Sequence, residues 1–156
     1  MDRTVKLRVR VDYATYSALK EVEEEYREVL EEAINYGLSS KTASFTRIKA
    51  GIYGGEEREK HKDLPSHYIY TACEDASERL DSFEKLKKRG GRAYTDKPSV
   101  RMVTVHLDDH LWKFSLSIIS ISTKKGKVLI SPTFLRSFGN IIIRAGGLRV
   151  RLGLNC

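Results

Sequence analysis

The chain contains little of several residue types that mark particular classes of protein. Its 156 residues include two cysteines, three prolines and eleven glycines. Two cysteines, Cys73 and Cys156, are too few for a disulfide framework, and the sequence has no Cys-x-x-Cys pair for a structural zinc site. With 40% hydrophobic and 31% charged residues, the composition argues against disorder and collagen-like repeats. The sequence therefore predicts one folded domain, or a small domain that carries an insertion.

Long hydrophobic runs are also missing. The longest apolar stretch, residues 115–121, alternates with serines and falls far short of the roughly 20 residues that a membrane-spanning helix requires. The first ten residues carry charges throughout and contain no apolar block before a cleavage site, so we expect no signal peptide. From these absences we expect a cytoplasmic protein that has no membrane partner.

Positive charge is unevenly distributed along the chain. The formal net charge is +7, yet residues 1–84 hold 13 basic and 18 acidic side chains, while residues 85–156 hold 15 and 3. No aspartate or glutamate follows His110. A surface of one charge sign raises the local concentration of phosphates. The distribution therefore predicts that RNA or DNA is the partner and that the C-terminal half carries most of the contacts.

The N-terminal half predicts one strand and three helices. Alternation of apolar and basic residues over Thr4–Val11 is typical of a half-buried strand. Asp12 is expected to cap a helix whose apolar residues recur every three or four positions and which ends at Gly37. Two further helices are predicted, one from about 44 to 53 and one from a cap at Ser66 to about residue 89. A charged connector separates these two helices.

After Pro98 the hydrophobic period changes to two, which predicts strands. A strand is expected over 102–107, with apolar and polar residues on opposite sides. A second strand is expected over 112–123, which the adjacent Ile118 and Ile119 interrupt with a bulge or a break. We also predict that Trp112 packs in the core.

The end of the chain predicts a hairpin loop over 124–127 and a final basic strand over 148–152. Residues 134–142 fit a helix that Gly139 interrupts. The expected fold class is therefore α+β, with a small antiparallel barrel or sheet into which a three-helix lobe is inserted. We expect the first strand to pair with a distant strand, within 100–107 or 148–152.

Groups that could carry catalysis are scarce. His106 and His110 are four residues apart across a strand and a turn, and the aspartates 108–109 suit a turn, so a metal site is not expected. The acidic runs 21–25 and 31–32 are interpreted as a solvated helix face. The sequence has no glycine-rich phosphate loop and no nucleophile elbow. We therefore predict no catalytic residue, no enzymatic activity, no cofactor, no metal and no small-molecule substrate.

The remaining pattern is one of basic residues interleaved with aromatic and hydroxyl side chains. Lysine and arginine neutralise backbone phosphates, and aromatic rings stack on bases. The candidate nucleic-acid-binding residues lie on the outer face of the first strand, at the end of the third helix and in the C-terminal half. They are Lys6, Arg8, Arg10, Lys85, Lys87, Lys88, Arg89, Arg92, Tyr94, Lys97, Arg101, Lys113, Lys124, Lys125 and Lys127.

The order of these pieces resembles the N-terminal half of the transposon-encoded TnpB (OrfB-type) RNA-guided nucleases, especially archaeal ones. The resemblance covers about residues 3–152. It rests on the opening strand T-V-K-L-R-V-R-V-D, on L-P-S-H-Y-I-Y-T-A-C-E-D-A-S-E-R-L-D-S-F-E-K-L, on a basic G-G-R linker, and on strands containing V-T-V-H-L and S-I-S-T-K-K-G-K-V-L-I. Each motif is short, and their order along the chain is more specific than any one of them.

The resemblance implies a domain organisation and a function. In TnpB proteins a helical recognition lobe, here residues 13–97, is inserted into an oligonucleotide-binding-like wedge barrel, here residues 1–12 and 98–156. Together they hold a guide RNA and read a short DNA motif beside the target. The Asp-x-Gly strand of the family's RuvC nuclease and its zinc ribbon do not occur in this sequence. The chain therefore resembles the nucleic-acid-binding half of such a protein, expected to be monomeric without nucleic acid.

Two other classes of function remain open. A basic strand followed by a helix also begins a ribbon-helix-helix repressor, which pairs that strand across a dimer and inserts it into the major groove. Such a unit needs only about 45 residues and two helices, and it leaves the basic strands after Ser99 without a role. The chain could also be a protein-interaction module without nucleic acid, which a flat response of binding to salt would favour.

Overall fold

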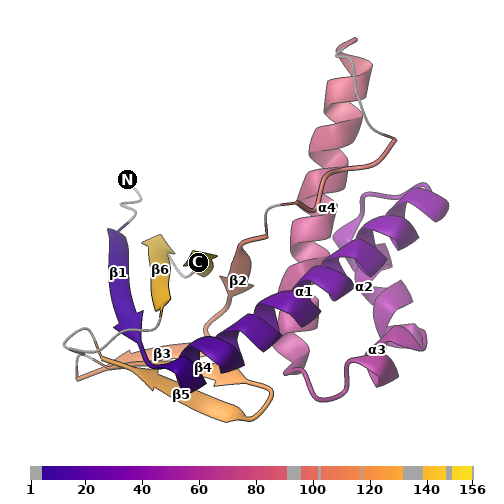
Figure 1. Ribbon diagram of the computed structural model, residues 1–156. Coiled ribbons are helices and arrows are strands. Elements are labelled where there is room, and N and C mark those ends of the chain that lie inside the picture. The colour runs from indigo at the N-terminus through magenta and orange to yellow at the C-terminus, as the bar shows by residue number, and fades with distance from the viewer. Residues whose placement is uncertain are drawn as a thin grey trace.

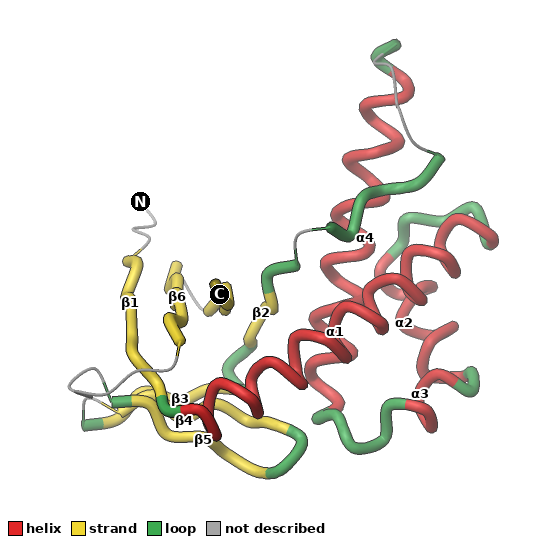
Figure 2. The backbone as a smooth tube through the Cα atoms, viewed as in Figure 1, coloured by secondary structure: helices red, strands yellow, loops and turns green. Residues whose placement is uncertain are grey.

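The computed structural model describes residues 5–90, 96–101, 103–116, 118–131, 139–146 and 149–155, and in the strands over 5–10, 139–146 and 149–155 it describes the backbone only. The fold class is α+β, as predicted. Figure 2 shows the helices gathered on one side and the strands on the other, with the first helix leading from the strands into the helical part. One strand precedes the helices and the others follow them, so the helices form an insertion within the β part of the chain.

The first helix, α1 (Tyr13–Ser39), begins as the sequence predicts. The side chain of Asp12 accepts a hydrogen bond from the backbone N–H of Thr15 at 2.8 Å. This bond satisfies one of the amides that a helix start leaves without a partner, and it lowers the pKa of the Asp12 carboxyl. The predicted end of the helix is wrong, because α1 continues through a buried Gly37 to Ser39.

The remaining helices are α2 (Phe45–Gly54), α3 (Glu57–Lys60) and α4 (Ser66–Lys88). The short helix α3 lies within the charged connector and was not predicted. Ser66 is the first residue of α4 rather than its cap; Pro65 occupies the cap position, and no side chain caps this end. No helix among the described residues is both long and apolar enough to cross a membrane.

The core of the helical part lies between α1 and α4. Buried apolar side chains on α1 face small residues on α4, Ala72 and Ala76, which allow the two helices to approach closely. Two tyrosines at this contact are fully buried, and each donates its hydroxyl to a backbone carbonyl: Tyr26 to Thr71 at 3.3 Å and Tyr68 to Ser122 at 2.6 Å. Burial raises the pKa of both phenols, so both remain protonated donors.

One sheet has four antiparallel strands in the order β1-β6-β7-β2, namely β1 (Val5–Val11), β6 (Gly139–Gly146), β7 (Arg149–Asn155) and β2 (Val105–Leu107). The expected helix over 134–142 is wrong where it is described, because residues from Gly139 onward form β6. The predicted partner of the first strand is wrong as well. That partner is β6, while the two segments we named as candidates contain β2 and β7, which pair with each other.

A second antiparallel sheet has the order β3-β4-β5 and lies beneath β1 and β6 in Figure 1. Its strands are β3 (Trp112–Ser115), β4 (Ile118–Thr123) and β5 (Gly126–Ile130). The expected interruption at Ile118 and Ile119 is wrong, because both residues belong to β4. The break lies before them, at a hairpin turn that contains Leu116, whose φ is 48°. The predicted hairpin loop is correct, since Lys124 and Lys125 connect β4 to β5. Among the described residues both sheets are open, so the barrel form of the prediction is not seen there.

Candidate nucleic-acid interface

The four-stranded sheet has two chemically different sets of positions. Successive residues of a strand fall on opposite faces, and the register of a sheet aligns positions that share a face. One face carries most of the apolar residues of the strands, such as Leu7, Ile143 and Leu152, which are in register, while Ile142 is in register with Arg8 on the other face. The other face carries the Lys and Arg positions of β1, β6 and β7, which are Lys6, Arg8, Arg10, Arg144, Arg149 and Arg151. These three strands contain no acidic residue.

The register aligns three of these positions directly across the sheet. Lys6 pairs with Arg144, and Arg144 pairs with Arg151. Like charges opposite each other on neighbouring strands destabilise a sheet by about 0.2–1 kcal/mol per pair. The sequence predicted the β1 residues but not Arg144, Arg149 or Arg151 as candidates, because β6, the strand that lies between β1 and β7, was expected to be a helix.

The row continues to His106 on β2, opposite Arg151. All three residues of β2 are buried, including His106 at 7% exposure, so the expected alternation of buried and exposed positions in this strand is wrong. β2 lies between the rest of the sheet and the helices, and it contacts α4. Apart from the buried His106, the positions of this row belong to β1, β6 and β7.

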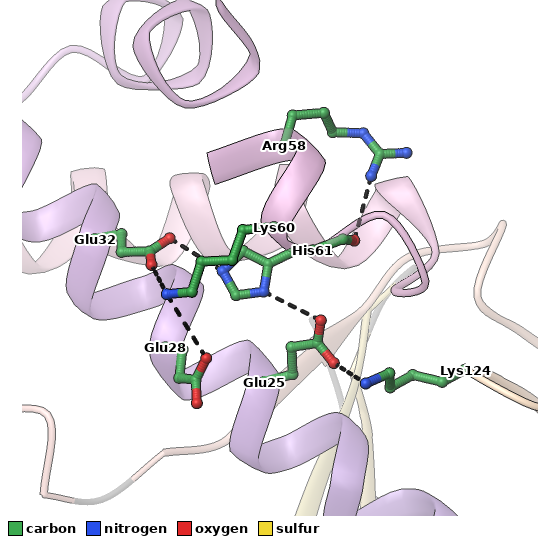
Figure 3. Close-up of polar contacts among 7 residues, drawn as sticks. All are labelled: Glu25, Glu28, Glu32, Arg58, Lys60, His61 and Lys124. Atoms are coloured by element: carbon green, nitrogen blue, oxygen red, sulfur yellow. Dashed lines mark hydrogen bonds and ion pairs between the residues drawn. The ribbon is translucent and has the colours of Figure 1, made fainter. Parts of the chain in front are cut away.

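Lys124 and Lys125, two candidates in the hairpin loop, lie in ion pairs within the protein. Lys124 contacts Glu25 of α1 at 2.5 Å, and Lys125 contacts Glu21 at 3.3 Å. The hydrogen bond from Lys124 to Glu25 is the main cause that raises the pKa of this lysine. These lysines hold the β4–β5 hairpin against α1. Figure 3 shows the contact of Lys124 with Glu25.

Glu25 also contacts a buried histidine in the segment that the sequence predicts to be a connector. His61 is 2% exposed; its Nδ1 lies 3.1 Å from Glu25, and its Nε2 lies 3.1 Å from Glu32 (Figure 3). Lys60 also contacts Glu32, and this contact raises the pKa of the lysine. The interpretation of this α1 face as simply solvated is therefore wrong at Glu25 and Glu32, which join α1 to α3 and to the hairpin.

The cluster at the end of α4 lies far from the four-stranded sheet, at the top of Figure 1. Lys85 pairs with Asp81 at 2.6 Å, and the ammonium group of Lys87 lies 4.6 Å from the centre of the Phe83 ring. Lys88 and Arg89 are exposed. Arg92 and Tyr94, the next two candidates, lie outside the described residues.

Lys97 and Arg101 line an open groove of about 1050 Å³ between α1 and the segment that leads to β2. Arg27 of α1 lies on the opposite wall, and its Nε atom is buried without a hydrogen-bond partner. Glu31 and Asp96 also line the groove, so its charge is mixed. This groove is a weaker match to a polyanion than the basic sheet face.

The last two candidates, Lys113 and Lys127, are exposed on the three-stranded sheet. Trp112, beside Lys113, packs against the core, as predicted. The structure therefore distributes the predicted residues over several surfaces. The cationic positions that it brings together most closely are those of β1 with the arginines of β6 and β7.

The fold and this surface define a class of protein: a helical insertion in an antiparallel β part whose main sheet has one basic face. Residues 22–122 match the model of the family described as "Uncharacterized protein MJ0013 family", and the chain belongs to that family. The matched segment runs from α1 to β4.

A relative from Methanocaldococcus jannaschii, "Uncharacterized protein MJ0857", is 36% identical over 155 residues. The match covers 92% of this chain and 56% of the relative, so the chain spans little more than half the length of that protein. The names of this family and of this relative state no activity, and the resemblance to TnpB remains a prediction.

Proposed function

We propose that this chain is a cytoplasmic protein that binds RNA or DNA through the basic face of its four-stranded sheet and does not cut it. The observation that carries the proposal is the row Lys6–Arg144–Arg151, in which cationic positions are neighbours across three strands. Such a row costs folding free energy in the free protein. A polyanion that neutralises it would recover that cost on binding.

The proposal also draws on the resemblance to TnpB proteins. A wedge-like part with a basic sheet and an inserted helical lobe would hold a guide RNA, or the DNA beside its target, through phosphate contacts. Phosphate contacts dominate affinity for nucleic acids and are insensitive to sequence. No hydrolysis is expected with Mg²⁺ or Mn²⁺, because metal-assisted cleavage needs carboxylates that converge on the ions, and the basic strands contain none.

The ribbon-helix-helix alternative fits less well. Such a repressor pairs its strand with a second copy of itself, whereas β1 here pairs along its whole length with β6 of the same chain. A protein-interaction module without nucleic acid is the other alternative, and the salt dependence of binding separates it from the proposal.

The test is binding of fluorescent RNA and DNA oligonucleotides, single-stranded and duplex, at several salt concentrations. The logarithm of the binding constant should fall linearly with the logarithm of salt concentration, by about 0.9 per phosphate contact for duplex DNA and about 0.7 for a single strand. Replacing Arg144 and Arg151 together by glutamine should make this slope shallower by about 1.4–1.8. The same variant should unfold at higher urea concentration, because two repulsive pairs, Lys6–Arg144 and Arg144–Arg151, are removed.

The matched control is Arg47→Gln with Lys62→Gln, which removes the same charge from exposed positions on the helical part. This control should leave the slope unchanged. A third variant, Lys88→Gln with Arg89→Gln, tests whether the end of α4 contributes. Equal loss of binding in all three variants would point to non-specific attraction and would contradict the assignment to the sheet.

A further inference from the structure

Three potential metal ligands from distant parts of the sequence meet beside the start of α4. They are His67, the second residue of α4, with Asp108 and His110 from the turn between β2 and β3. Their nearest ligand atoms all lie within 4.8 Å of one another. His67 Nδ1 lies 2.6 Å from Asp108 Oδ2, and His110 Nδ1 lies 3.8 Å from the same oxygen.

The turn holds the Asp108 carboxylate in a defined orientation. Its Oδ1 atom accepts a hydrogen bond from the backbone N–H of His110 at 3.0 Å, and its backbone carbonyl accepts one from Leu111 at 3.1 Å. Local bonds of this kind are typical of an aspartate that begins a turn. They leave Oδ2 directed toward both imidazoles, which is how partner groups orient a ligating carboxylate.

The helix side of the cluster is held equally firmly. Tyr68, next to His67, is buried and donates its hydroxyl to Ser122 of β4 at 2.6 Å. This bond fixes the first turn of α4 against the second sheet. His67 therefore faces the β2–β3 turn from a rigid base, although the two segments lie about 40 residues apart in sequence.

A hydrogen bond between His67 and Asp108 would by itself explain two of the three residues. His110 joins the same cluster, because its ring stacks on that of His67 with centroids 3.9 Å apart and an angle of 13° between the planes. Asp109 adds a second carboxylate, 3.1 Å from His110 Nδ1. Two imidazoles and two carboxylates form a donor set that suits a divalent cation.

We propose that His67, Asp108 and His110 bind a divalent transition-metal ion, with Zn²⁺ as the best match. Two imidazole nitrogens and one carboxylate oxygen are borderline ligands that suit zinc. Tetrahedral Zn–N and Zn–O bonds of about 2.0–2.2 Å place ligand atoms about 3.3 Å apart. The observed separations of 2.6 and 3.8 Å bracket this value. Because the two rings are stacked, both partly exposed side chains have to rotate before their nitrogens point at one ion. Water or Asp109 completes the coordination.

The ion would connect the start of α4 to the turn between β2 and β3, and so join the helical insertion to both sheets. Binding to the folded state alone stabilises a protein by mass action. The proposal is independent of the proposed function, because it concerns a different surface and its test uses no nucleic acid.

The experiment is a titration of the chelator-treated full chain with Zn²⁺ by calorimetry, and with Co²⁺ as an absorbing substitute. Both the natural chain and a Cys156→Ser variant are used, so that the thiol is not mistaken for a ligand. We expect one Zn²⁺ per chain at micromolar concentration, a higher Tm with Zn²⁺, and the visible absorption of four-coordinate Co²⁺.

His67→Asn and His110→Asn should each weaken Zn²⁺ binding by at least about 100-fold and abolish the rise in Tm. Circular dichroism establishes that these variants fold, which we expect because both side chains are partly exposed. The control is Glu59→Gln, which removes an exposed carboxylate from the acidic surface near α3. Absence of Zn²⁺ binding by the natural chain, or binding that both histidine variants retain, would overturn the proposal.

Discussion

At the scale of single residues, Gly37 shows that a glycine needed for close packing can be mistaken for the end of a helix. A glycine that ends an apolar stripe usually marks the end of a helix, yet here the helix continues. A Cβ atom added at Gly37 would collide with the Leu80 side chain and lie 2.8 Å from the backbone oxygen of Thr42. The glycine therefore allows α4 and the segment after α1 to approach the helix.

We predict that Gly37→Ala destabilises the protein by about 1–3 kcal/mol. The collision with a backbone oxygen forces the chain to shift, which outweighs the roughly 1 kcal/mol that alanine gains over glycine within a helix. Urea unfolding measures the difference. Gly54→Ala is the matched control, because a Cβ there meets nothing within 4 Å, and its free energy of unfolding should be unchanged or slightly higher. Equal stability of both variants would contradict this role of Gly37.

Burial also explains why Cys73, which lies among acidic residues on α4, is unreactive. The side chain is fully buried in the core between the helices, and burial raises the pKa of the thiol to about 12. Since the thiolate is the reactive form, this cysteine is a packing residue in the core.

At the scale of elements, the β4–β5 hairpin is held to α1 by charged groups. Lys124 and Lys125 were selected from the sequence because lysines in a loop commonly contact phosphates. In the structure they contact Glu25 and Glu21, more than 95 residues away in the chain. No local pattern reveals such partners, because the spacing that brings them together is set by the whole fold.

We predict that Lys124→Ala lowers the free energy of unfolding by about 0.5–1 kcal/mol and leaves nucleic-acid affinity almost unchanged. The lost ion pair is partly exposed, which limits its contribution, but it belongs to the network around His61. Lys127→Ala, in the same hairpin and on an exposed position, is the control for stability. A large loss of nucleic-acid binding in Lys124→Ala, without loss of stability, would contradict this prediction and would show that Lys124 contacts the nucleic acid.

Whether an element could be predicted from the sequence depends on its hydrophobic period. Elements with a strong periodic pattern, β1, α1, α2, α4 and β7, were predicted, because one face of each is apolar. The element that was mistaken, β6, contains the run Ile141-Ile142-Ile143, in which apolar residues occupy both faces and the period disappears. Without this strand the register that aligns Lys6, Arg144 and Arg151 could not be derived, so the candidate site was predicted only in part.

At the scale of the whole molecule, the two ends of the described chain meet in one sheet. β1 pairs with β6 over its full length, and β7 connects β6 to β2. The helices lie between β1 and β2 in the sequence, so they form an insertion between the two edge strands of this sheet. Figure 1 shows β1 and β6 side by side, apart from the helices. A sheet built in this way depends on contacts between residues that are distant in sequence.

The expected consequence is that removal of residues 1–11 exposes β6 but leaves the second sheet folded. β1 is an edge strand in the described sheet, and its loss leaves one edge of β6 and part of an apolar face without a partner. Amide hydrogen exchange should show loss of protection in β6, while β4 and β5 keep theirs because they pair only within the other sheet. The full chain, as control, should be a monomer by light scattering. A dimer that dissociates when residues 1–11 are removed would instead support strand pairing between two copies, as in a ribbon-helix-helix protein, and would contradict the in-chain pairing of β1 with β6.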